Sequence, residues 1–200
     1  MNRIFATLAV LSNLGLAAAF WLGWSIEDAS GVSAEAGRQV GLHFLTALGA
    51  SLIALLVHAV ALTYFMGTGR WVEETSEAYG LGPEARRENI RLKYRTLPGM
   101  VLCVLLIIGT GALGAIADPA SRTELPAAAT IHFTLACVTL LANILANSIQ
   151  QQAISANGRL VDEVLAQAQR IRGERGLPRD RKHAGEEQGT PVTTNQDRAR

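Results

Sequence analysis

Long apolar stretches alternate with polar segments along this chain. Residues 4–26, 40–66, 97–117 and 127–149 contain no Asp, Glu, Lys or Arg. An α-helix rises about 1.5 Å per residue and a bilayer core is about 30 Å thick, so each stretch is long enough to cross a membrane. The pattern predicts an all-α integral membrane protein, with residues 1–149 forming an up-down-up-down bundle of four helices.

The positively charged residues are concentrated in two of the polar segments. The segment between the second and third apolar stretches carries six Lys and Arg residues, and the segment after the fourth carries nine, whereas the other three have one each. The positive-inside rule therefore places the N- and C-termini in the cytoplasm. We expect a bacterial inner membrane protein whose partner is the lipid bilayer, and the net charge of +1 argues against a nucleic-acid partner.

The first apolar stretch has a second interpretation. Arg3 precedes it and Ala17 to Ala19 are small enough for cleavage, as in a signal peptide. The apolar run continues past these alanines through "FWLGW", which favours a retained helix.

The polar segments predict shorter elements. Gly67 and Gly69 are expected to end the second span, and "GLGP" at 80–83 to divide the following segment into two short interfacial helices. Pro98 is expected in the first turn of the third span, where proline is tolerated.

The chain after the fourth span predicts two further regions. An apolar stripe indicates a separate cytoplasmic amphipathic helix over 150–172. The tail from 173 to 200 is almost entirely polar and is expected to be disordered.

Three histidines lie within the apolar stretches, where a polar ring is costly unless a partner satisfies it. His43 and His58 share one side of the second span, about 22 Å apart along the helix axis. His132 lies in the fourth span, at a depth similar to that of His43. Because these two spans are expected to be parallel and diagonal, His43 and His132 can face each other across the bundle.

A facing pair of neutral imidazoles is how haem b is held, with the iron between them. Small residues nearby, including Gly111 and Gly114, leave room for a porphyrin. The stretch "HFLTALGASLIALLVH", with His132 and these glycines, resembles the membrane cytochrome b of quinol-oxidising complexes, in which parallel helices each carry two histidines about four turns apart. The resemblance implies haem b as cofactor. A separate stretch, "FMGTGRWVEE", is similar to bacterial multi-span proteins without an assigned function.

The sequence departs from the cytochrome b pattern at the inner site. The position fifteen residues after His132 is Asn147 rather than histidine, so a second haem is not expected. We expect His58, Asn143 and Asn147 to form an inner-face polar site, through hydrogen bonds or beside a quinone or proton path.

Two functions remain open on these grounds. The first is a cytochrome b-like subunit that carries one haem on His43 and His132 and exchanges electrons with a quinone or a membrane redox complex. The second is a non-catalytic subunit of a larger complex, whose histidines bond to the backbone or to Thr46 and Thr130. A non-haem metal is a third use for the histidine pair, and a transporter is disfavoured because the spans contain no carboxylate. Neither main interpretation is a stand-alone enzyme.

Overall fold

The computed structural model describes residues 1–26, 33–118, 121 and 125–176. They form four helices and no strand: α1 (Asn2–Trp24), α2 (Ala34–Tyr79), α3 (Glu84–Ala117) and α4 (Ala128–Glu174). All four are long and apolar enough to cross a membrane. The structure thus confirms an all-α chain with four candidate membrane spans.

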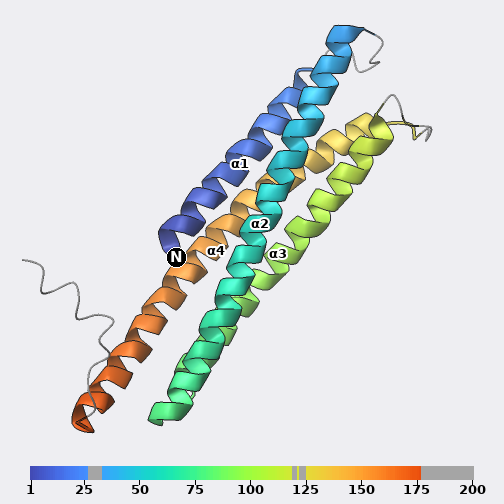
Figure 1. The fold of residues 1–200 in the computed structure, drawn as a ribbon. Helices are drawn as coiled ribbons and strands as arrows, with labels where there is room; N and C mark the ends of the chain where they lie inside the picture. The colour runs from blue at the N-terminus through green and yellow to red at the C-terminus, as the bar shows by residue number, and fades with distance from the viewer. Residues whose placement is uncertain (27–32, 119–120, 122–124, 177–200) are drawn as a thin grey trace, which may run out of the picture.

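The helices form an elongated bundle (Figure 1). Helices α2 and α4 have 46 and 47 residues, so at about 1.5 Å per residue each is longer than a bilayer is thick. Helix α1 lies along one half of the bundle, next to α2 and α4, whereas α2, α3 and α4 continue well beyond its N-terminus. Among the described residues, α1 has no contact with α3, while α2 and α4 meet across the bundle. Helices α1 and α3 therefore occupy opposite corners.

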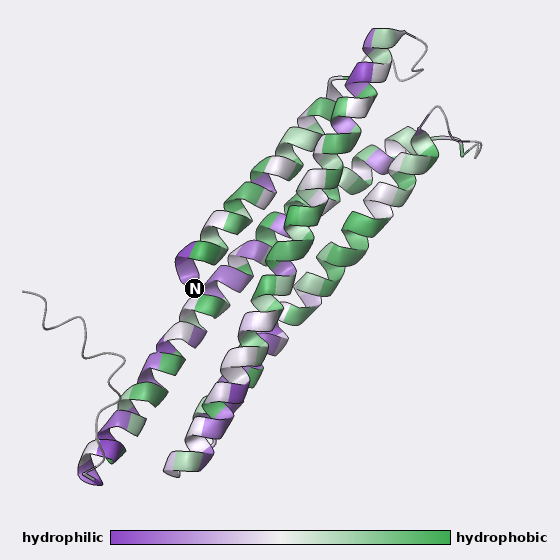
Figure 2. Cartoon of the chain, viewed as in Figure 1, coloured by the Kyte–Doolittle hydropathy of each residue, from purple (hydrophilic) through white to green (hydrophobic). Residues whose placement is uncertain are grey.

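Hydropathy divides the bundle into two parts (Figure 2). The half that contains α1 is largely hydrophobic, and the far ends of α2, α3 and α4 are largely hydrophilic. In the hydrophobic half large apolar side chains face outward: Leu45, Leu105 and Leu145 are 65%, 61% and 64% exposed. Buried positions there include Ser12, Asn143 and other polar or small residues. Apolar side chains outside and polar ones inside suit a protein whose surroundings are lipid hydrocarbon.

Three predictions about helix ends are wrong. Helix α2 continues through Gly67 and Gly69 and ends at Gly80, whose φ of 67° is left-handed. The expected interfacial helices are instead the ends of α2 and α3, although the chain does turn at "GLGP" as predicted. Pro98 lies inside α3 and not in its first turn, because that helix begins at Glu84, well before the expected start at residue 97.

The region after the fourth span also differs from expectation. Residues 150–172 are not a separate helix but continue α4 without a break. The apolar stripe expected there packs in part inward, with Val164 and Ala168 only 2% and 4% exposed. Residues 177–200 of the predicted disordered tail lie outside the described residues.

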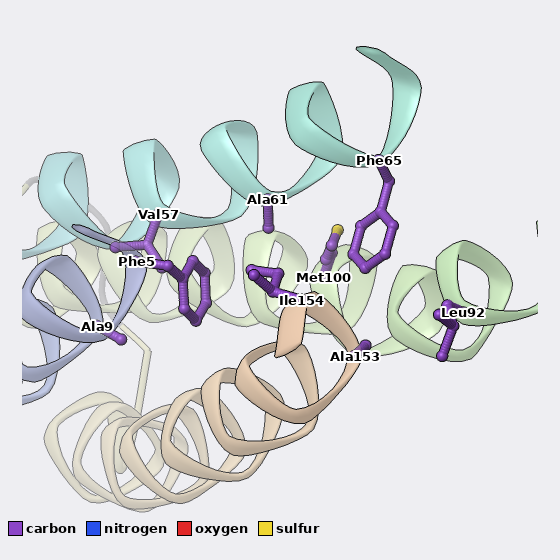
Figure 3. Packing of buried hydrophobic residues seen from close by; sticks show 9 residues of the cluster. All are labelled: Phe5, Ala9, Val57, Ala61, Phe65, Leu92, Met100, Ala153 and Ile154. Atoms are coloured by element: carbon purple, nitrogen blue, oxygen red, sulfur yellow. The ribbon is translucent and has the colours of Figure 1, made fainter. Parts of the chain in front are cut away.

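Apolar side chains from all four helices meet at the middle of the bundle (Figure 3). Phe5 from α1 and Phe65 from α2 are the largest of them, with 0% and 1% exposure, and Met100 and Ile154 come from α3 and α4. The α2 members of this cluster are Val57, next to His58, and Ala61 and Phe65, which lie farther from His43 along the helix. The cluster joins the hydrophobic half to the part of the bundle beyond the N-terminus of α1, where only α2, α3 and α4 continue, here called the three-helix extension.

Candidate functional site: a facing histidine pair

The structure brings His43 of α2 and His132 of α4 together. Their ring centres lie 6.2 Å apart and the ring planes are nearly perpendicular, at 85°. Two imidazoles that ligate one metal ion from opposite sides have centres about 6.5 Å apart, given a metal–nitrogen bond of about 2.05 Å and a nitrogen about 1.2 Å from its ring centre. The observed separation of 6.2 Å is close to that value.

Each ring is held by the helix that precedes its own. His43 Nδ1 lies 2.9 Å from the backbone oxygen of Ala19 in α1, and His132 Nδ1 lies 3.0 Å from that of Thr110 in α3. A carbonyl oxygen only accepts hydrogen bonds, so Nδ1 carries the proton in both rings. The neutral rings therefore keep their Nε2 lone pairs for a ligand.

A glycine lies against the edge of each ring. A Cβ placed on Gly23 would lie 2.8 Å from His43 Cε1, and one on Gly114 would lie 3.0 Å from His132 Cε1. Because the side chain would start from helix backbone, the imidazole would have to move. Gly114, expected beside the cofactor, thus contacts a histidine, whereas Gly111 lines the cavity described next.

Both histidines line one cavity between the four helices. It measures about 100 Å³, within about 560 Å³ of atom-free space that includes its opening. Its lining is mainly apolar, with Leu16 and Phe20 from α1 and Ile107 from α3. The cavity gives the histidine pair a dry environment with room beside the rings.

Few other side chains could complete a metal site here. Among residues 1–26, 33–118, 121 and 125–176, no group of three or more His, Cys, Asp or Glu is placed to hold a metal ion. A structural zinc ion needs four protein ligands. Two imidazoles alone suit a group that brings its own remaining ligands, and haem, with four porphyrin nitrogens and two open axial positions, is such a group.

His58 lies in a different environment. His58 Nε2 is 3.1 Å from Asn143 Oδ1, and its Nδ1 is 2.9 Å from the amide nitrogen of Gln150. The second contact requires the amide to donate, so Nδ1 accepts and Nε2 donates. Both ring nitrogens are thus engaged with α4, and His58 is only 3% exposed. The expected bond to Asn143 is present.

Asn147 has another partner. Its Nδ2 donates to Asn13 Oδ1 at 3.1 Å, and Asn143 Nδ2 donates to the same oxygen at 2.9 Å. Asn147 and His58 belong to one polar cluster with no direct hydrogen bond between them among the described contacts. The Oδ1 of Asn147 and Oε1 of Gln150 are buried without a partner among the described residues.

A second polar cluster lies farther along the bundle. Asn89 Nδ2 donates to Asn157 Oδ1 at 2.7 Å, and Asn157 Nδ2 donates to Thr68 Oγ1 at 2.8 Å. Thr68, Asn89 and Asn157 come from α2, α3 and α4, so the cluster ties the three long helices together. It lies beyond the N-terminus of α1, where the three-helix extension begins.

Sequence reasoning identified the histidines but missed what orients them. The carbonyls of Ala19 and Thr110 have no sequence signature of their own. The spacing did contain a signal, since in both helices a glycine follows the carbonyl residue by four positions. Of the two kinds of partner considered for these rings, the backbone or Thr46 and Thr130, the described hydrogen bonds show the backbone.

Comparisons with known proteins leave the geometry as the guide to function: no family model, curated protein or solved structure matches this chain.

Proposed function

We propose that this protein is a membrane b-type cytochrome subunit that binds one haem between His43 and His132. The observation that carries the proposal is the facing imidazole pair: 6.2 Å between ring centres, with Nδ1 of each ring bonded to a backbone carbonyl. The Nε2 atoms of His43 and His132 take part in no described hydrogen bond, whereas both ring nitrogens of His58 do.

The residues around the pair suit this role. His43 and His132 would hold the haem, and the haem would supply one-electron redox chemistry. The carbonyls of Ala19 and Thr110 hold the tautomer that leaves Nε2 open, as carbonyl partners of metal-bound histidines do. Apolar residues such as Leu16 and Ile107 exclude water from the site.

The proposal extends to the arrangement in the membrane. Both termini and the turn between α2 and α3 lie in the cytoplasm, because their segments carry most of the Lys and Arg residues. The four helices then cross a bacterial inner membrane up-down-up-down, and the histidine pair lies near the outer face. Electrons pass between a quinone or a membrane redox complex and a partner on that face.

One observation favours a second candidate function, a non-catalytic subunit of a larger complex. The Nδ1 bonds link α1 to α2 and α3 to α4, as purely structural histidines would. In that case each histidine contributes about 1 to 2 kcal/mol to stability, and no pigment is bound.

A reduced-minus-oxidised visible spectrum of the purified protein separates the two functions. The protein is expressed with ample haem and purified in mild detergent. We expect the bands of a six-coordinate haem b, lost in His43→Ala and in His132→Ala but kept in His58→Ala. A flat spectrum from monodisperse wild-type protein, or bound copper without haem, would contradict the proposal.

A further inference from the structure

The two helical hairpins, α1 with α2 and α3 with α4, place their histidine, glycine and carbonyl partner at equivalent positions around the cavity. Three pairs define the match: Ala19 with Thr110, Gly23 with Gly114, and His43 with His132. In both hairpins the carbonyl residue precedes the glycine by four positions on the first helix. In both, the histidine on the second helix bonds to that carbonyl and lies against that glycine.

The match extends to the cavity wall. With the helices paired in this way, every lining position except Thr139 has an equivalent in the other hairpin that also lines the cavity. They include Leu16 with Ile107, Phe20 with Gly111, and Ala47 with Ala136. The cavity is therefore built by equivalent faces of the two hairpins.

The match continues along α2 and α4, away from the histidines. Equivalent positions there are completely or almost completely buried, at 0% or 1% exposure. They are Ala54 with Asn143, Ala61 with Gln150, and Phe65 with Ile154. Because side chains so different in size and polarity share the same burial, the two hairpins pack alike even where their residues differ.

We propose that the hairpins are structural repeats and that the repeated unit is an imidazole cradle, in which Gly23 and Gly114 are positioning residues. In each cradle the first helix supplies a carbonyl that fixes the tautomer and a glycine that lets the ring edge approach the backbone. The second helix supplies the histidine. A ligand between the two rings then lies on the pseudo-twofold axis that relates the hairpins and meets equivalent imidazoles on its two faces.

The histidine that lies elsewhere on α2 shows that the cradle is specific to the cavity. The repeat pairs His58 with Asn147, and both are 3% exposed. His58 is held by two amide side chains and by no backbone carbonyl among its described bonds. No described glycine lies against its ring. Both hairpins therefore have the cradle at the cavity, around His43 and His132, and neither has it around His58 or Asn147.

The glycines are tested by replacing each with alanine in the full chain. The inference rests on the proposed haem site. Supporting shells of metal ligands are worth about 10- to 100-fold in affinity, so we expect Gly23→Ala and Gly114→Ala each to weaken haem retention about tenfold or more. Both should also shift the low-spin ferric EPR spectrum and the midpoint potential. Gly49→Ala is the matched control on α2, since nothing lies within 4 Å of the added Cβ.

A second measurement separates this inference from the haem proposal. In haem-free protein, ¹⁵N NMR of the histidine rings should show His43 and His132 protonated on Nδ1 only. Gly23→Ala should disturb the His43 signals alone, and Gly114→Ala those of His132 alone. That pattern in a protein that binds no haem would support the cradle and overturn the cytochrome. Nε2-protonated rings in the wild type, or variants that leave both NMR and EPR spectra unchanged, would overturn the cradle.

Discussion

Histidine rings lie at two places in the hydrophobic half of the bundle, at the cavity and around His58, and their hydrogen bonds differ. At the cavity, His43 and His132 each use Nδ1 on a backbone carbonyl. At the lower level, His58 uses both nitrogens on side chains of α4. The first arrangement leaves Nε2 of two cavity-lining rings without a described hydrogen bond, and the second leaves no ring nitrogen unused. The difference teaches that a membrane histidine is a ligand candidate only when its second nitrogen is unused.

Replacing His58 should have the largest effect on stability. His58→Leu removes the partner of Asn143 and Gln150, which are both fully buried. Unsatisfied buried groups cost about 1 to 3 kcal/mol each, less within membranes, so we expect a loss of about 2 to 3 kcal/mol. Equilibrium unfolding in mixed micelles measures it. His58 is not a ligand of the proposed haem, so we expect the folded variant to bind haem as the wild type does. Loss of haem from the folded variant alone would contradict the comparison.

The cluster in the three-helix extension should give the next largest effect. Asn157→Ala removes one hydrogen bond from the amide of Asn89 and one from the hydroxyl of Thr68, which keep only their longer contact of 3.3 Å with each other and the bond from Thr68 to the Tyr64 carbonyl. We expect a loss of about 1 to 2 kcal/mol in unfolding free energy, with an unchanged haem spectrum. A spectral change would show that the extension and the cavity are coupled, which the account does not predict.

Two glycine substitutions in α2 should have smaller effects on stability. A Cβ on Gly69 would lie 2.5 Å from Asn89 Oδ1, whereas one on Gly67 meets nothing within 4 Å. Gly67→Ala should stabilise the helix by up to about 1 kcal/mol, through the higher helix propensity of alanine. Gly69→Ala should stabilise the protein less than Gly67→Ala or destabilise it, because the Asn89 side chain must shift to admit the added Cβ. Equal thermal midpoints for the two variants would argue against the described packing of Asn89.

Asn147→His should leave the haem content unchanged. The variant restores a histidine opposite His58, as the cytochrome b pattern has, but His58 keeps both partners and no glycine lies against its ring. Haem analysis per polypeptide measures the outcome. A second bound haem would mean that His58 can leave Asn143 and Gln150, contrary to the comparison.

The sequence was sufficient to predict four helices long and apolar enough to cross a membrane, and the pairing of His43 with His132, because apolar runs of this length form helices. It was insufficient for the helix ends. Gly67, Gly69 and Pro98 lie inside long helices because neighbouring helices support them, so tertiary packing outweighs their low propensity. The cradle was missed for a different reason: backbone carbonyls such as that of Ala19 are present at every residue, and only the fold shows which one a ring meets.

The central claim is that one level of the bundle holds haem and the other does not, and the haem-to-polypeptide ratio of the purified protein tests it most directly. Haem extracted as its pyridine complex, divided by protein from amino-acid analysis, should give one haem b per chain. A ratio near zero for folded protein expressed with ample haem would contradict the cavity site. A ratio near two would contradict the structural role of His58.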